Sequence, residues 1–181
     1  MHTKGAGFAE PKTNILQMGL REGMKVADLG CGSGHYTFAA SAIVGSTGRV
    51  YAVDIQEDHL SRLRGEALEQ GIRNIETIWR DFEKAGGTML KDHALDAVIL
   101  SNTLFQIEHV EGAIAEIKRI LKPSGKLLVI DWAGEYGGLG PAKELVMSEQ
   151  KTEEIFITGG FHKVKSFRGG PHHYSILFTA P

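Results

Sequence analysis

The chain of 181 residues has a single cysteine, Cys31, so it cannot form an internal disulfide bond. This scarcity argues against a secreted disulfide scaffold and favours a reducing compartment, which we take to be the cytoplasm. Hydrophobic runs are short, and residues 97–100 are typical of them. A membrane-spanning helix needs about 20 apolar residues. Residues 1–11 lack the apolar core of a signal peptide, so we expect no membrane association.

A strong charge of one sign is also lacking. The chain has 20 Lys and Arg against 22 Asp and Glu, which gives a formal net charge of −2. This balance creates no broad positive field that would attract nucleic acid or an anionic membrane. We therefore expect no nucleic-acid partner. The basic residues Lys163, Lys165 and Arg168 are interpreted as a solvated face rather than a phosphate site.

The chain does contain an alternation of short β-branched runs with helical patterns. This order predicts parallel strands joined by crossover helices, and the length fits a single domain over residues 1–181. Strands are predicted at residues 26–29, 50–53, 75–79, 95–100 and 127–130. Helices are predicted at residues 35–44 and 57–70, around residues 114–121, and within residues 141–158. Residues 161–167 and 174–179 predict a terminal antiparallel hairpin joined by Gly169-Gly170-Pro171.

The most informative segment is a glycine-rich turn between the first predicted strand and helix. It reads Asp28-Leu29-Gly30-Cys31-Gly32-Ser33-Gly34. Glycines in such a turn let the backbone approach a ligand, and the helix N-terminus offers free N–H groups. The spacing G-x-G-x-G differs from the dinucleotide fingerprint G-x-G-x-x-G, because His35 occupies the third small position. A nicotinamide-dependent oxidoreductase is therefore disfavoured.

A carboxylate ends the second predicted strand. Asp54 follows the glycine turn at about the 20-residue spacing that nucleoside-binding folds use to hold a ribose. Its alternative interpretation is an exposed loop aspartate. Asp81 follows the third predicted strand, and its alternative role is the N-cap of a helix over residues 82–90.

These segments, in this order, resemble the class I methyltransferases that use S-adenosylmethionine (SAM). The glycine turn resembles motif I, residues 50–54 motif II, Arg80-Asp81-Phe82 motif III and residues 95–102 motif IV. Residues 121–126 resemble the turn before the family's fifth strand. Within the class, the chain most resembles the ubiquinone/menaquinone-type small-molecule methyltransferases. The resemblance implies an α/β, Rossmann-like, seven-stranded mixed sheet in the order 3-2-1-4-5-7-6, with helices on both faces and the last strand antiparallel.

The resemblance also implies the cofactor and the residues that bind it. SAM would lie along Asp28, Gly30, Cys31, Gly32, Gly34 and Ser101, with Asp28 ordering the loop. Asp54 would accept from the ribose hydroxyls, Ile55 would pack on adenine, and Asp81 and Phe82 would bind the adenine edge. Cys31 is interpreted as a small residue that fits the loop, not as a nucleophile.

The acceptor and a general base are less well defined by the sequence. Candidates for a catalytic role are Asn102, His109, Asp131 and His173. Candidates to line the region around the sulfonium are Phe8, Tyr36, Asn102 and Phe105. The adjacent His172 and His173 would point to opposite faces of a strand, so no metal site is expected.

The fourth predicted strand is followed by Ser101-Asn102-Thr103-Leu104-Phe105, not by the Asn- or Asp-Pro-Pro-Tyr of amide methyltransferases. This departure argues against amide methylation and leaves O-, C-, N-, arsenic and thiol acceptors open. The resemblance implies a small-molecule acceptor, and we expect a monomer or homodimer. Residues 1–22 are expected to cover the cofactor, and the glycine-rich residues 134–140 are the predicted lid. A methyltransferase acting on protein or RNA and a non-catalytic SAM-binding module remain alternatives.

Overall fold

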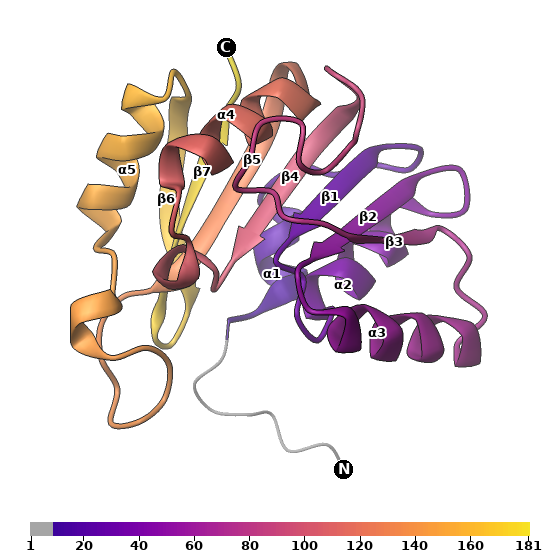
Figure 1. Cartoon of the computed structure of the whole chain (residues 1–181), viewed down its shortest axis with the longest axis horizontal. Helices are drawn as coiled ribbons and strands as arrows, with labels where there is room; N and C mark the ends of the chain where they lie inside the picture. The colour runs from indigo at the N-terminus through magenta and orange to yellow at the C-terminus, as the bar shows by residue number, and fades with distance from the viewer. Residues whose placement is uncertain (1–8) are drawn as a thin grey trace.

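The protein folds around one seven-stranded sheet, seen in the computed structural model, which describes residues 9–181 (Figure 1). The strands lie in the order β3-β2-β1-β4-β5-β7-β6. β7 pairs antiparallel with both β5 and β6, and the other neighbours are parallel. The predicted fold class, strand order and antiparallel last strand are confirmed.

Most strands and helices lie where the sequence predicts them. The strands are β1 (Lys25–Leu29), β2 (Arg49–Asp54), β3 (Ile75–Trp79), β4 (Leu95–Ser101), β5 (Leu121–Trp132), β6 (His162–Gly170) and β7 (His173–Thr179). The helices are α1 (Pro11–Leu16), α2 (His35–Val44), α3 (Glu57–Glu69), α4 (Val110–Ile120) and α5 (Glu149–Thr158). Two short 3-10 helices, η1 (Leu104–Gln106) and η2 (Lys143–Leu145), precede α4 and α5.

Two details differ from the prediction. The helix within residues 141–158 begins only at Glu149, because the Ser148 hydroxyl accepts from the Lys151 N–H at 3.2 Å and caps α5 there. The hairpin turn is Pro171-His172, and the two glycines before it belong to β6. Gly169 lies against the Ser175 hydroxyl, and a side chain at this position would collide with it.

Each face of the sheet packs into its own core. Val26 of β1, Ile99 of β4 and Leu128 of β5 pack with α1 and α2 on one face. Leu29, Leu100 and Val129 point to the opposite face, where α4 and α5 cover them. This alternation along each strand is the period-two pattern of a sheet buried on both faces. The helices on both faces leave the carboxyl ends of the parallel strands free for loops.

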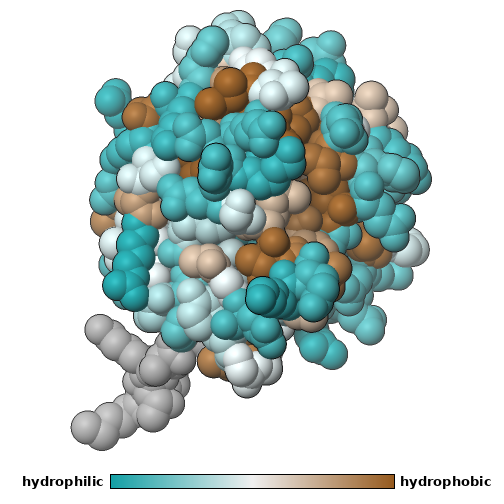
Figure 2. Space-filling model, turned by 90° about the vertical axis from the view of Figure 1, so that its left-hand side faces the viewer, coloured by the Kyte–Doolittle hydropathy of each residue, from teal (hydrophilic) through white to brown (hydrophobic). Residues whose placement is uncertain are grey.

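The side of the molecule that carries α5 and the segment before it shows hydrophobic surface between hydrophilic side chains (Figure 2). The exposed large hydrophobic residues there are Leu139, Leu145 and Ile157, which are between 43% and 54% exposed. Within residues 9–181, no helix has the length and apolar character required to cross a membrane.

Candidate functional site

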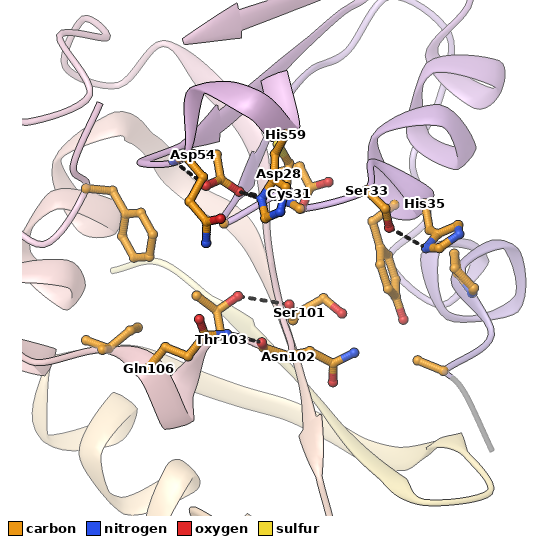
Figure 3. A pocket seen from close by; sticks show the side chains of 18 of the residues that line it. Asp28, Cys31, Ser33, His35, Asp54, His59, Ser101, Asn102, Thr103 and Gln106 are labelled. Atoms are coloured by element: carbon orange, nitrogen blue, oxygen red, sulfur yellow. Dashed lines mark hydrogen bonds and ion pairs between the residues drawn. The ribbon is translucent and has the colours of Figure 1, made fainter. Parts of the chain in front are cut away.

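A cavity of about 1040 Å³ opens at the carboxyl ends of β1, β2, β3 and β4. Open α/β sheets bind ligands at this edge, near the point where the strand order reverses. Here that point lies between β1 and β4. Figure 3 shows Asp54 and Ser101 on opposite sides of this cavity. Four segments that are separate in sequence therefore meet in one site.

The glycine turn forms one wall. Gly30 has φ of +71°, and a Cβ there would lie 2.7 Å from Thr103 Cγ2, so only glycine fits. Gly32 has φ of +49°, but a Cβ there would meet nothing within 4 Å. At Gly32 the backbone therefore borders open space in the cavity, as a loop that cradles a ligand would.

Asp54 lies at the end of β2 and is 6% exposed. Its carboxylate accepts from the Gly32 N–H at 2.9 Å and from the Gln56 N–H at 2.8 Å. His59 Nδ1 lies 3.4 Å from the same carboxylate. Each carboxylate oxygen can accept a further hydrogen bond, so Asp54 can bind hydroxyl donors while it holds the glycine turn. The alternative of an exposed loop aspartate is wrong.

Two side chains of the glycine turn, those of Asp28 and Cys31, are buried. The Asp28 carboxylate accepts from the Thr37 hydroxyl at 2.6 Å, which ties β1 to the first turn of α2. Burial raises the pKa of Asp28 to about 6, against the opposing effect of the Thr37 hydrogen bonds. Burial also raises the pKa of the Cys31 thiol well above its usual range. Cys31 packs among Leu60 and Leu63, which agrees with a residue that fits the loop rather than a nucleophile.

The segment after β3 supplies Asp81 and Phe82 to the cavity. The Asp81 carboxylate accepts from the Glu83 N–H at 2.8 Å and pairs with Lys84 at 3.0 Å. The hydrogen bond from Glu83 and the ion pair with Lys84 lower the pKa of Asp81. The residues that follow form turns, so the alternative role of Asp81 as a helix N-cap is wrong.

Ile55 and Phe82 give the cavity apolar surface. Ile55 lines the cavity with 63% of its surface exposed. Phe82 also lines it but is 5% exposed, because most of its ring packs into the core. A flat apolar ligand lying over Ile55 would cover surface that no other part of the described chain covers.

The segment after β4 forms the opposite wall, with Ser101, Asn102 and Thr103 lining the cavity. Asn102 has φ of +54°, a conformation that asparagine tolerates better than most residues. Asp131 holds this segment, since its carboxylate accepts from the Leu104 N–H at 2.9 Å and the Trp132 N–H at 2.8 Å. Burial raises the pKa of Asp131 to about 6.

The structure separates the four catalytic candidates. Asn102 lines the cavity, whereas His109, Asp131 and His173 are not among its lining residues. His109 is exposed at the start of α4, and its N–H donates to Glu83 at 2.7 Å. His173 is 2% exposed, with its ring 4.3 Å from that of Trp132. Of the candidates for the sulfonium region, Tyr36 lines the cavity, Phe105 does not, and Phe8 lies outside the described residues.

Apart from Phe8, sequence reasoning did not identify individual residues of the N-terminal segment. Residues 9–13 line the cavity, which supports the expectation that the N-terminal segment covers the cofactor. Asn14 holds this segment by donating to the Tyr36 hydroxyl at 2.8 Å and the Gly169 carbonyl at 2.7 Å. Pro11 at the first turn of α1 was a readable helix-start signal. His59, Gln106, Ile107 and Pro171 also line the cavity, and no sequence motif marks them.

The strand order, the glycine turn after β1 and the carboxylate after β2 together define a class I, Rossmann-like SAM-dependent methyltransferase. The comparison with known families agrees. The chain belongs to the family described as methyltransferase domain, whose model matches residues 20–164. SAM is accordingly the cofactor of this class.

Known proteins and structures resemble the chain over different lengths. The ubiquinone/menaquinone biosynthesis C-methyltransferase UbiE of Stutzerimonas stutzeri is 35% identical over 116 residues, which are 64% of this chain and 44% of that protein. The chain thus spans less than half of that relative. A SAM-dependent methyltransferase from Aquifex aeolicus has a TM-score of 0.87 at 28% identity, with 96% of this chain and 90% of that chain covered.

A third comparison concerns the fold alone. The [4+2]-cyclase SpnF superimposes with a TM-score of 0.80 at 16% identity, over 94% of this chain and 79% of that chain. That protein is named for a cyclisation and not for methyl transfer. The fold therefore does not by itself decide the reaction, which must be argued from the site.

Proposed function

We propose that this chain transfers the methyl group of SAM to a small-molecule acceptor by in-line displacement. The observation that carries the proposal is a single cavity that joins the glycine turn, Asp54 and Asn102 under the N-terminal segment. Its volume of about 1040 Å³ is at the top of the range of roughly 300–1,000 Å³ for a drug-sized ligand. This volume supports the proposal that a cofactor and a small acceptor bind side by side in the cavity.

The residues present fit SAM along the length of the cavity. We propose that the backbone of Gly30, Cys31, Gly32 and Gly34, with Ser101, holds the methionine end, and that Asp28 orders this loop. The open space at Gly32 supports this assignment. Asp54 accepts from the two ribose hydroxyls with lone pairs that its backbone donors leave free.

At the other end, the exposed side chain of Ile55 packs on one face of adenine. Asp81 accepts from the adenine amino group, and the Phe82 N–H donates to a ring nitrogen. The Asp81 side chain is 37% exposed, and its carboxylate stays ionised because its hydrogen bonds lower its pKa. Those hydrogen bonds also fix its orientation, which limits the entropy lost on binding.

When bound, SAM would supply a methyl group whose bond to sulfur breaks as the bond to the acceptor forms, leaving S-adenosylhomocysteine (SAH), and the proton that the acceptor loses would pass to solvent. The chain itself provides alignment and exclusion of water. Alignment of two reactants can lower a barrier by as much as about 7–11 kcal/mol. Residues 9–13 cover the cavity, and Asn14 anchors them to α2 and to the hairpin. The C-methyltransferase activity for which the UbiE relatives are named supports testing carbon acceptors first.

The test is a transfer assay with methyl-labelled SAM. The full chain is incubated separately with a pooled small-metabolite extract, with total protein and with total RNA. Label that appears in a small molecule supports the proposal, and Asp54→Asn serves as the impaired variant. Label in protein or RNA alone would identify a macromolecular acceptor and overturn it. SAH binding without label in any fraction would indicate a non-catalytic SAM-binding module.

A further inference from the structure

Buried polar atoms without a hydrogen-bond partner are concentrated in one corner of the molecule. Among the side chains of residues 9–181, they are Asn102 Oδ1, His172 Nδ1, both ring nitrogens of His173 and Ser175 Oγ. Burying a polar atom without a hydrogen-bond partner destabilises the folded state by about 1–3 kcal/mol, so each such atom in a native structure calls for an explanation. Elsewhere the buried polar groups are paired, as Asn14 and Glu116 show.

The sheet topology brings these atoms together. The Asn102 N–H donates to the Ile130 carbonyl of β5 at 2.9 Å. Ile130 pairs with Ser175 of β7, and Trp132 pairs with His173. The unpaired atoms therefore lie at the end of β4 and the start of β7, on either side of the end of β5. His173 and Ser175 are 2% and 0% exposed.

Aromatic rings form the walls of this corner. The His173 ring lies 4.3 Å from that of Trp132, and the His172 ring lies 4.0 Å from that of Tyr136. The rings of Trp132 and Tyr136 are 6.4 Å apart. Gly140 has φ of +79°, and a Cβ there would approach Trp132 to 2.6 Å, so the segment after β5 lies directly against this wall. Such surfaces favour a flat ring.

The corner adjoins the cofactor cavity. Asn102 lines that cavity, and so does Pro171, which precedes His172 in the hairpin turn. Figure 3 shows Asn102 across the cavity from Asp54, with its side chain pointing away from Asp54 and His59. A molecule bound against Asn102 would thus lie on the side of the cavity away from the proposed ribose site.

The charged groups around the corner are already engaged. Arg168 donates to the carbonyls of Gly170 at 3.1 Å and Pro171 at 2.9 Å. The Asp131 carboxylate accepts from two backbone N–H groups of the segment after β4 and of β5. An ionised ligand would be desolvated here without a free counter-charge, which is unfavourable. Asn102 Oδ1 lacks a donor, and His173 lacks both a donor and an acceptor.

We propose that Asn102 and His173, with Trp132 and Tyr136 as walls, form an acceptor subsite for a flat, uncharged ring that bears an O–H or N–H group. The proposal rests on the proposed function, because it places the acceptor beside the cofactor. The ring stacks on the aromatic wall while its O–H or N–H donates to Asn102 Oδ1. Trp132, Tyr136 and His173 are not among the residues that line the cofactor cavity, so entry requires residues 133–140, which include Tyr136, to move off Trp132 and then to close over the ring.

The experiment uses the full chain saturated with SAH and four probes: phenol, indole, toluene and benzoate. Binding is measured by equilibrium dialysis and by the shift of the His173 resonance in a ¹⁵N-histidine-labelled sample. Phenol or indole is expected to bind at least tenfold more tightly than toluene and benzoate, and to shift His173. Binding of phenol but not indole would show that the subsite prefers an O–H donor, and binding of indole but not phenol would show that it prefers an N–H donor. Equal binding of toluene, preferred binding of benzoate, or no binding of phenol and indole would overturn the proposal.

Two variants locate the binding. Asn102→Gly keeps a residue that tolerates positive φ, and His173→Phe keeps a ring but removes both nitrogens. Each variant is expected to weaken binding of the preferred probe at least tenfold. His162→Phe, at an exposed histidine of β6, is the control and is expected to leave probe binding unchanged. Thermal stabilisation by SAH reports that each variant is folded. If His173→Phe does not fold, Asn102→Gly alone tests the subsite. Undiminished probe binding by Asn102→Gly would then overturn the proposal.

This design separates two kinds of failure. If SAH does not bind to the unmodified chain, the proposed function fails, whatever the probes do. If SAH binds and the probes do not discriminate, the cofactor site stands and the acceptor subsite is wrong.

Discussion

At the scale of single residues, Asp54 connects the backbone to the proposed ligand. Asp54→Asn preserves the size of the side chain but replaces one accepting oxygen with a donor, so it disturbs both the Gly32 contact and the ribose contacts. We expect SAH binding to weaken by about 1–3 kcal/mol, as measured by isothermal titration calorimetry. The matched control is Asp58→Asn, on an exposed residue of α3. Equal SAH affinity in the two variants would remove Asp54 from the site.

The buried His173 gives a pH-dependent prediction. Burial lowers its pKa from 6.5 to about 4, so between these values the unfolded chain binds a proton that the folded chain does not. Folding stability is then lost as the pH falls from about 6.5 to 4. Relative to His173→Phe, the unmodified chain is expected to lose up to about 1.4 kcal/mol per pH unit in this window. Urea unfolding at several pH values measures it, and parallel stability curves would contradict the prediction.

Individual site residues could be predicted from sequence where a local motif requires them. Gly30 and Gly34 have positive φ, and Asp54 ends its strand facing the cavity, as their positions in the sequence suggested. Asn14 and Pro171 could not be found in this way. Their roles depend on the packing of the N-terminal segment against a hairpin about 155 residues away. Nothing local in the sequence encodes such a contact.

At the scale of elements, α4 holds the segment after β3 through one buried carboxylate. Glu116 is 0% exposed and accepts from the Gly86 N–H at 2.7 Å, the Thr88 N–H at 3.0 Å and Arg119 at 2.7 Å. Although burial alone raises the pKa of Glu116, the hydrogen bonds from Arg119, Thr88 and Gly86 lower it to about 2. The segment lacks regular secondary structure, and the Glu116 carboxylate pairs two of its backbone N–H groups instead.

Glu116→Ala is therefore expected to reduce the free energy of unfolding by about 3–5 kcal/mol, the usual cost of removing one partner of a buried ion pair. Glu153→Ala, which breaks a pair with Lys163 that is about one-third exposed, is expected to cost no more than about 1 kcal/mol. Urea unfolding compares the two variants. Similar losses in both would mean that the Glu116 contacts add little to the stability of the fold.

Elements with a strong periodic pattern and clear boundary signals were predictable. α2 and β3 have the predicted bounds, because a glycine precedes α2 and β-branched residues fill β3. The segment between β3 and β4 was not predictable in detail, since Asp81 and Glu116 hold it through side-chain contacts rather than through backbone pairing. α5 lies within the predicted residues 141–158, but its start at Glu149 was not predicted, because it depends on the contact of the Ser148 side chain that caps it.

At the scale of the whole molecule, the alternation of strands and helices was sufficient to predict a mostly parallel sheet. The exact strand order came from resemblance to a family, since composition and periodicity do not fix which strands are neighbours. The position of the cavity then follows from topology, because the chain leaves β1 for α2 on one face of the sheet and leaves β4 for α4 on the other, at the point where the strand order reverses. The position of residues 9–13 at that cavity depends on the tertiary contacts of Asn14.

The most direct test of the account is a thermal-shift titration of the full chain with SAM, SAH and NAD in parallel. A ligand at 100 times its Kd stabilises the fold by about 2.7 kcal/mol. For a chain of this length that corresponds to a rise in Tm of roughly 5–10 °C. We predict this rise with SAM and SAH and none with NAD. No shift with either adenosyl compound, or a shift with NAD alone, would contradict the assignment of the cavity as a SAM site.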